Sequence, residues 1–156
     1  MRINAIRVPI QSRKVNGIMA SKQHHKKKRI AVVPVVMSKT RLKVYLITSR
    51  EERKWIIPTG KLEKKLNNRQ VAALEAFEEA GILGKLDKHF REQVLLQSPS
   101  GKHKRKTTVF LLYVKRILKC WPEIHDRKRK LVSLKKYLKS VSNRKLKRKL
   151  TKNIYA

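Results

Sequence analysis

The chain has very little of what marks several common protein classes. It contains one cysteine, Cys120, in 156 residues, which excludes an internal disulfide and suits a reducing setting, so we expect a cytoplasmic protein. No apolar run approaches the roughly 20 residues that a membrane helix requires, so we expect no membrane span. Acidic residues are scarce as well: none occurs before Glu51.

The shortage of acidic residues leaves a large excess of positive charge. The chain has 42 Lys and Arg against 10 Asp and Glu, a formal net charge of +32. Such a potential attracts nucleic acid, polyphosphates and phosphorylated small molecules from a distance. The charge runs along the whole chain rather than one segment, which does not favour a dedicated groove-reading protein. Charge therefore narrows the partners to anions without choosing among them, and the oligomeric state stays open.

Length and composition predict one folded domain. A chain of 156 residues with 40% apolar residues can build a single core. We place that domain at residues 24–156, with a basic helical segment at its C-terminal end. Residues 1–23 are predicted to be a basic arm, disordered or loosely attached. The same arm also has features of a transit peptide, and a third alternative is that translation begins at Met19.

The apolar pattern predicts an α+β fold. We expect strands at 30–37, 42–48, 54–58, 91–97 and 107–118, with Pro34 bending the first or placing it at an edge, and a basic loop at 101–106. A helix capped by Asn67 or Asn68 should run to Ala80 and stop at Gly81. Its buried stripe is predicted to be Val71, Leu74 and Phe77, and the chain should be helical again from Ser133. The expected architecture has helices on both sides of one mixed sheet.

Three of the ten acidic residues lie within five positions of the predicted helix, Glu75, Glu78 and Glu79. Spacings of three and four place their carboxylates on one helix face, where like charges repel. A solvated face is the ordinary explanation for such a pattern. A hard divalent cation that prefers oxygen ligands would instead relieve the repulsion, so we predict a Mg²⁺ site, with Mn²⁺ as an alternative.

The surrounding sequence resembles a known signature. Trp55-Ile-Ile-Pro-Thr-Gly60, a loop, and Glu75-Ala-Phe-Glu-Glu-Ala-Gly-Ile82 are similar to the Nudix hydrolase box, a strand, loop and helix that bind metal and pyrophosphate. Two positions depart from the box: Leu66 stands where its first Glu belongs, and Leu74 where its Arg belongs. The two leucines are expected to pack together. The resemblance implies an α/β/α sandwich with a mixed central sheet.

Shorter matches resemble the diphosphoinositol polyphosphate phosphohydrolase branch of that superfamily. They are Lys27-Lys-Arg29 before the first strand, Lys104-Arg-Lys-Thr107 before a long apolar strand, and Arg127-Lys-Arg129 after Trp121-Pro-Glu123. The Glu-Trp that the branch has next is Lys130-Leu131 here. The implied substrates are diphosphoinositol polyphosphates, diadenosine polyphosphates or other nucleoside diphosphate derivatives.

The resemblance also implies roles for individual residues. Glu75, Glu78 and Glu79 would be both catalytic residues and metal ligands, and the backbone at Gly60 would approach the metal, with one carboxylate orienting or deprotonating the attacking water. The residues implied to contact substrate are Lys27, Arg29, Thr59, Lys104, Arg105 and Arg127.

Two functional hypotheses follow. The first is a metal-dependent pyrophosphohydrolase, whose activity the changes at Leu66 and Leu74 would reduce. The alternative is a non-catalytic or weakly active Nudix-like protein that binds RNA or polyphosphate through its basic surface. Removal of an RNA 5′-terminal phosphate combines both features. A hydrolase should require divalent metal for turnover, whereas a binding protein should lose affinity steeply with salt.

Overall fold

A computed structural model describes residues 28–156 of the chain. The predicted arm at 1–23 and Lys27 lie outside this range. The strands are β1 Arg29–Ser38, β2 Arg41–Thr48, β3 Trp55–Ile56, β4 Thr59–Lys61, β5 Ile82–Gln97, β6 Lys104–Ile117 and β7 Arg129–Ser133. The helices are α1 Asn68–Ala80, α2 Leu134–Ser140 and α3 Arg144–Ile154. No helix within residues 28–156 is long and apolar enough to cross a membrane.

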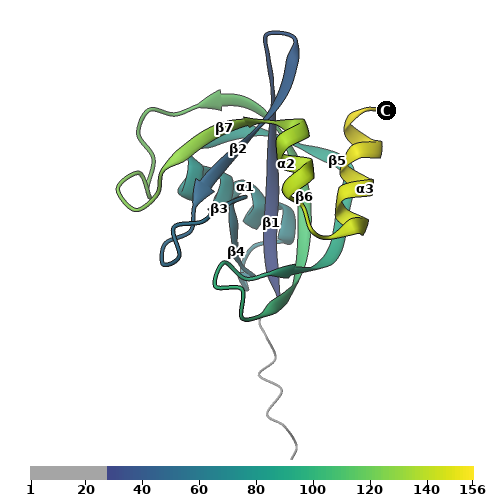
Figure 1. Ribbon diagram of the computed structural model, residues 1–156. Coiled ribbons are helices and arrows are strands. Elements are labelled where there is room, and N and C mark those ends of the chain that lie inside the picture. The colour runs from purple at the N-terminus through teal and green to yellow at the C-terminus, as the bar shows by residue number, and fades with distance from the viewer. Residues whose placement is uncertain (1–27) are drawn as a thin grey trace, which may run out of the picture.

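All seven strands belong to one mixed sheet, which confirms the predicted fold class. The main order is β3-β2-β1-β6-β5, with β4 paired to β1 and β7 paired to β2. The β1 and β6 strands are parallel, and the other neighbours are antiparallel. Helix α1 covers one face of the sheet, and α2 and α3 cover the other (Figure 1).

Strand β1 is apolar from Ile30 to Met37, and both of its faces are covered from Ile30 to Val35. Successive side chains of a strand point to opposite faces, so Ile30 and Val32 enter the core under α1, while Ala31 and Val33 enter the core under α2 and α3. The strand lies inside the sheet and not at its edge, contrary to one of the two expectations for Pro34. Pro34 is accommodated because β4 pairs only up to Ala31 and β2 only from Val35 onward, which leaves a gap for its missing N–H.

Helix α1 begins and ends where the sequence predicted. The Asn67 side chain accepts from the Gln70 N–H at 2.9 Å, and the Gln70 side chain accepts from the Asn67 N–H, completing a capping box. Gly81 ends the helix in the left-handed conformation, at φ 63°. The predicted buried stripe was wrong in part: Val71 is buried, but Leu74 and Phe77 are only half-buried, and alanines and Glu79 face the sheet instead.

Several elements differ from the sequence prediction. The β5 strand starts at Ile82, nine residues early, and register shifts after Leu83 and Leu86 interrupt it, so its sequence shows no regular alternation. The loop expected at 101–106 is shorter, since Lys104 already pairs with Gln97 in the sheet. Residues 59–61, expected to open a loop, form β4, and the predicted helix from Ser133 is preceded by β7 and divided into α2 and α3.

Asp87 joins three elements at one of these irregularities. Its carboxylate accepts from the N–H groups of His89 and Phe90, from the Tyr113 hydroxyl at 2.8 Å and from the Asn153 amide at 3.4 Å. Burial raises the pKa of Asp87, but these hydrogen bonds outweigh burial and bring the pKa below its ordinary value. The carboxylate thus ties the β5 bulge to β6 and α3.

Replacing Gly81 should cost more stability than replacing the other left-handed glycine, Gly101. Any side chain pays roughly 1 kcal/mol for the positive φ at either position. At Gly81 a Cβ would also lie 2.9 Å from Trp121 Cβ, whereas at Gly101 the nearest atom is 3.8 Å away. We expect Gly81→Ala to lose about 3 kcal/mol and Gly101→Ala about 1 kcal/mol in urea unfolding. Equal losses would contradict the tight contact with Trp121.

Asp87→Asn should destabilise the protein in a pH-dependent way. A carboxyl with a lowered folded pKa stabilises the fold above its unfolded pKa of about 3.9, and this stability disappears as pH falls through the folded pKa. We expect a loss of roughly 1 kcal/mol at pH 7, because the side chain is half-exposed and water screens it. The difference from wild type should shrink between pH 5 and about pH 3 in urea titrations. Asp126→Asn, at an exposed position, is the control and should change little.

Candidate active site

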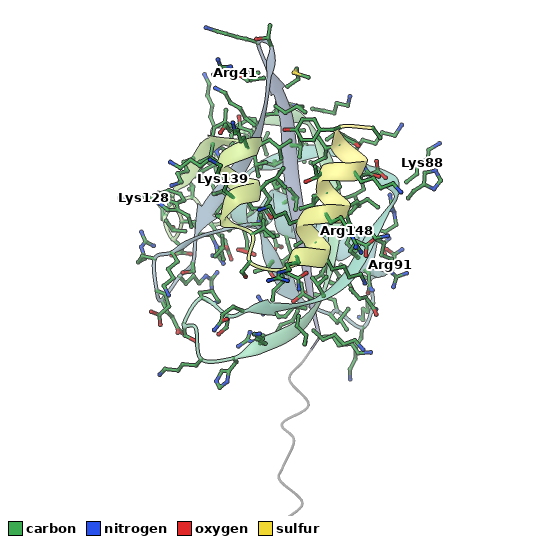
Figure 2. The ribbon with its side chains drawn as sticks, turned by 45° about the vertical axis from the view of Figure 1, so that its right-hand side comes forward. Arg41, Lys88, Arg91, Lys128, Lys139 and Arg148 are labelled. Carbon is green, nitrogen blue, oxygen red and sulfur yellow. The ribbon has the colours of Figure 1, made fainter. Side chains whose placement is uncertain are left out.

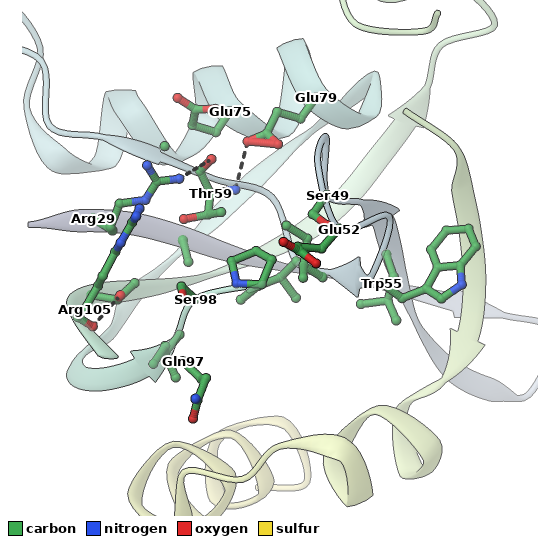
Figure 3. A pocket seen from close by; sticks show the side chains of 18 of the residues that line it. Arg29, Ser49, Glu52, Trp55, Thr59, Glu75, Glu79, Gln97, Ser98 and Arg105 are labelled. Carbon is green, nitrogen blue, oxygen red and sulfur yellow. Dashed lines mark hydrogen bonds between the residues drawn. The ribbon is translucent and has the colours of Figure 1, made fainter. Parts of the chain in front are cut away.

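A cleft of about 790 Å³ lies at the end of the sheet where the central strand β1 begins. Glu75, Glu78 and Glu79 of α1 line one side of it, and Arg29 and Arg105 lie beside them on β1 and β6. Figure 3 shows Glu75 and Glu79 projecting from the helix above Thr59, with Ser98 and Gln97 toward the opposite side. The structure therefore brings most of the predicted site residues to one cavity.

Glu79 is the most buried of the three glutamates, with only 2% of the residue exposed. Its Oε1 accepts from the Thr59 N–H at 3.0 Å, which joins α1 to β4. Its Oε2 has no aligned hydrogen-bond partner, the only such buried side-chain atom among residues 28–156, although Arg127 Nη2 lies 2.7 Å away. The contact with Arg127 is therefore an ion pair that leaves Oε2 free to accept.

The Glu75 side chain lies close against the backbone of Gly60. A Cβ at Gly60 would lie 1.8 Å from Glu75 Oε1, so any other residue here would force the Glu75 side chain to move. The glycine thus lets β4 and α1 come together at the cleft. The approach of the Gly60 backbone to a metal stays a prediction.

The carboxylates repel one another in this cleft. Burial, followed by the neighbouring Glu75 carboxylate, raises the pKa of Glu79 well above its ordinary value, against the opposing effects of Arg127 and the Thr59 amide. Burial and the charges of Glu75, Glu123 and Glu63 also raise the pKa of Glu78. This local excess of negative charge occurs within a strongly basic protein. A cation bound there would favour the ionised carboxylates.

The donor set suits a hard divalent cation in atom type and charge. Three carboxylates on adjacent turns of one helix face the same cleft, and Glu79 has an unsatisfied buried oxygen. Within residues 28–156, however, no group of three His, Cys, Asp or Glu side chains is positioned to hold a metal as it stands. The carboxylates would have to turn toward one another, which neighbouring positions on one helix face permit.

Arg127 has a different environment from the one predicted. Its Nη1 donates to the Thr48 carbonyl at 3.0 Å, its Nε to Glu123, and its Nη2 pairs with Glu79. Its side chain is only 10% exposed. These contacts occupy the guanidinium that was predicted to bind phosphate. The same arginine also gives Glu79 a cationic partner, which Leu74 cannot provide.

Arg129 holds the end of the same helix. Its Nη1 donates to the Ala80 carbonyl at 2.6 Å, and both of its terminal nitrogens donate to the Leu118 carbonyl. Its guanidinium lies 4.2 Å from the Trp121 ring centroid. Helix α1 has no basic residue in its own last turn, so a cation from β7 interacts with its C-terminal dipole. Sequence reasoning missed this role, although the Arg127-Lys-Arg129 run marked the segment.

The remaining predicted substrate residues divide into two groups. Arg29 and Arg105 are close enough that burial, and then the charge of Arg105, lowers the pKa of the Arg29 guanidinium. The Thr59 hydroxyl donates to the Ile30 carbonyl at 2.9 Å, so it already has an acceptor. Lys104 is exposed and does not line the cleft. Arg29 and Arg105 are thus the predicted cations most available to a ligand.

Leu66 and Leu74, at the two positions that depart from the signature, lie in different environments. Leu66 packs against the core under α1, whereas Leu74 is half-exposed and is not part of that packing. The expectation that they pack together is therefore not supported. Leu66 cannot replace a carboxylate ligand, and Glu63, on the preceding loop, also lines the cleft.

One group of the residues that line the cleft is uncharged, although Arg105 on β6 pairs with Leu96 of this group. The group consists of residues 96–100, at the end of β5 and in the turn after it, and residues 140–142 between α2 and α3, together with Tyr137 and Leu146. These positions carry four serines, a glutamine and apolar groups. More than a quarter of the chain is Lys or Arg, so a group of lining residues without a cation of its own is chemically distinct, and we call it the neutral half. Sequence reasoning did not identify it.

Known structures share this fold. An Ap4A hydrolase from C. elegans superposes with a TM-score of 0.62 at 17% identity, covering 83% of this chain and 96% of that chain. The NUDIX domain of Shewanella oneidensis NrtR, crystallised with ADP ribose, gives a TM-score of 0.57 at 15% identity, with 83% and 88% covered. A NUDIX family hydrolase from Clostridium perfringens gives 0.57 at 22% identity, with 76% and 87% covered.

No protein-family model matches the sequence, and no curated protein shows significant sequence similarity to it. The structural likenesses establish that the chain has the fold of Nudix hydrolases. The diphosphoinositol branch remains a prediction from sequence alone.

Removing Arg127 should destabilise the protein more than removing an exposed arginine that shares one of its partners. Arg127→Ala leaves the buried Glu79 without its cation, which should cost roughly 3 kcal/mol. Arg50 also pairs with Glu123, but its side chain is 57% exposed, so Arg50→Ala should cost less than about 1 kcal/mol. Urea unfolding of both variants tests this. Similar losses would mean that the Glu79 contact contributes little.

Proposed function

We propose that the protein is a metal-dependent hydrolase that cleaves a pyrophosphate linkage in a phosphorylated substrate. The observation that carries this proposal is the meeting of three α1 carboxylates with Arg29 and Arg105 in one cleft. Opposite charges held side by side suit a substrate whose phosphate oxygens require cations on one side and a metal on the other. The fold shared with Nudix hydrolases adds support.

In the proposed reaction, water attacks one phosphorus of the linkage. A new P–O bond forms to the water oxygen, the bond from that phosphorus to the bridging oxygen breaks, and the bridging oxygen leaves with the electron pair on the second phosphate. The water proton passes to one of the carboxylates Glu75, Glu78 or Glu79 and then to solvent or product. Arg29 and Arg105 hold non-bridging oxygens, and arginine can do so through two hydrogen bonds.

Glu75, Glu78 and Glu79, with backbone near Gly60, would hold Mg²⁺ or Mn²⁺, which when bound supplies neutralising charge for the phosphates. Thr59 contributes by donating its N–H to Glu79, which fixes that carboxylate against β4. Arg127 lines the cleft as well, and its ion pair with Glu79 makes it a positioning residue for that carboxylate.

The neutral half of the cleft favours a nucleoside on one side of the linkage. A diphosphoinositol polyphosphate carries phosphates around its whole ring and needs cations on several sides. The serines, Gln97 and Tyr137 instead offer hydrogen bonds and apolar surface, which suit a base and a sugar. Diadenosine polyphosphates, other nucleoside diphosphate derivatives and RNA 5′ ends meet this requirement. The Ap4A hydrolase and the ADP-ribose complex among the similar folds agree with this choice.

A non-catalytic protein that binds RNA or polyphosphate is the second candidate. It is favoured by the burial of Leu66 at a ligand position and by the absence, within residues 28–156, of a preassembled metal group. The retained carboxylates count against it, because they would repel a polyanion without any gain. A cytoplasmic location, expected from the lone cysteine, stays a prediction.

Turnover on a substrate panel should separate the two candidates. We expect phosphate or nucleotide release from diadenosine tetraphosphate or triphosphorylated RNA with Mg²⁺ or Mn²⁺, with much less from a diphosphoinositol polyphosphate. Glu79→Gln should lower turnover by at least about 100-fold, and a chelator should abolish it. Glu92→Gln, which alters a glutamate paired with Lys145 and Lys149 instead, is the matched control. If folded wild type releases no more product than Glu79→Gln on any substrate, the enzyme proposal fails.

A further inference from the structure

Positive charge is distributed unevenly between the two helical layers. Helix α1 has one basic residue, Arg69, and three glutamates. Helix α2 has three lysines and α3 has six Lys or Arg, and neither contains an acidic residue. Figure 2 shows cationic side chains projecting outward from these two helices, with Lys139 and Arg148 labelled. Among the three helices, the positive charge is therefore concentrated on α2 and α3, which cover the same face of the sheet.

Some of these cations have partners and others do not. Lys145 and Lys149 lie 3.5 and 3.7 Å from the carboxylate oxygens of Glu92 on β5. Arg144, Lys147 and Arg148 are exposed, and no carboxylate within residues 28–156 forms an ion pair with them. Their spacing of three and four places the three cations on one helix face, which we call the α3 cationic face.

The α3 cationic face costs the isolated protein stability. The partial positive charge of a helix N-terminus favours acidic residues in the first turn and disfavours basic ones. Helix α3 begins with Arg144 and Lys145 and has no acidic residue in its first turn. Repulsion among the three unpaired cations adds to this cost. An anionic partner would reverse both unfavourable effects.

The α3 cationic face adjoins the proposed active site. Ser140, Val141 and Ser142 line the neutral half of the cleft, and α3 starts two residues later at Arg144. The Asn143 side chain caps α3 and also donates to the Leu95 carbonyl at 3.2 Å, which fixes the helix start against β5. Arg144, Lys147 and Arg148 do not line the cleft themselves, but Arg144 follows Ser142 by two residues, so a ligand that leaves the cleft beside residues 140–142 would reach the start of α3 next.

We propose that the α3 cationic face binds the phosphate backbone of a single-stranded RNA whose 5′ end enters the cleft. This inference rests on the proposed function, because the terminal pyrophosphate would lie at the glutamates and the first nucleoside in the neutral half. Chain synthesis from nucleoside triphosphates leaves such a linkage at RNA 5′ ends. A diadenosine polyphosphate is too short to reach α3 from the cleft. The α3 cationic face should therefore matter for RNA and not for diadenosine polyphosphates.

An anionic membrane fits the same face less well. Membrane-surface helices place large apolar side chains beside their cations so that these can insert among the lipids. In α3, Leu146 and Leu150 are 1% and 0% exposed because they pack in the protein core, and Ile154 at the helix end is half-buried. The face thus offers charge without an inserting group, which matches a solvated polyphosphate chain.

The test uses full-length protein carrying Glu79→Gln, so that binding is measured without turnover. The probe is a 12-nucleotide single-stranded RNA with a 5′-triphosphate, titrated between 50 and 300 mM salt. The triple variant Arg144→Gln, Lys147→Gln, Arg148→Gln should bind the RNA about tenfold or more weakly at 100 mM salt. The slope of log affinity against log salt concentration should fall in magnitude by about 2.

The control triple Lys39→Gln, Arg41→Gln, Lys43→Gln removes the same charge at the β1–β2 turn. That turn lies roughly 30 Å along β1 from the cleft. RNA binding by this control triple should stay within about twofold of RNA binding by the Glu79→Gln parent.

Activity and stability provide independent readouts. With Glu79 restored, the α3 triple should lose turnover on the RNA through a higher KM while keeping turnover on diadenosine tetraphosphate. Arg144→Glu should raise the melting temperature by about 2 °C while weakening RNA binding, which an unfolding defect could not produce.

Two results would overturn the inference. Equal weakening by both triples would show that net charge alone attracts RNA, and binding to phosphatidylserine vesicles that exceeds RNA binding would assign the face to membranes. If no substrate is hydrolysed but the RNA binding differs between the triples as expected, the proposed function fails and the RNA surface stands.

Discussion

The ion pair between Arg127 and Glu79 is the interaction on which the site depends. Both side chains are largely withdrawn from water, at 10% and 2% exposure, and they come from segments that are remote from each other in the sequence. The same arginine reaches Glu123 and the Thr48 carbonyl, so one guanidinium joins α1, β2 and the segment before β7. A buried pair of this kind contributes little net stability, but the loss of either partner is costly. The ion pair therefore fixes the position of α1 against the sheet and adds little to the free energy of unfolding.

This arrangement explains how α1 can carry three glutamates without a cation of its own beside them. Leu74 stands where the sequence resemblance leads one to expect an arginine, and α1 has no basic residue in its last turn. Arg127 approaches Glu79 from outside the helix, while Arg129 caps the same helix at Ala80. The segment 127–129 thus supplies both charges that hold the acidic helix against the sheet. The remaining repulsion among the carboxylates is what the proposed metal ion would relieve.

The parts of the fold with a clear local cause were predictable. The Asn67 cap, the Gly81 stop and the apolar strands β1, β2 and β6 follow from side-chain chemistry that acts within a few residues. The β5 strand was mostly missed because its bulges break the alternation. The β7 strand was missed because it is only five residues long and is held in place by pairing with β2. Only the neighbouring strands supply the hydrogen bonds that make these segments extended.

The sequence by itself determined the acidic cluster, the glycine before it and the spacing between them, since helical periodicity alone brings Glu75, Glu78 and Glu79 to one face. Tertiary structure decided which cations serve them. In a chain with 42 Lys and Arg, charge cannot identify partners, because partnership depends on burial and distance between remote segments. Arg127 became a buried anchor, Arg29 and Arg105 came to line the cleft, and Lys104 stayed in solvent, since only the folded sheet sets which cations lie within reach of the carboxylates.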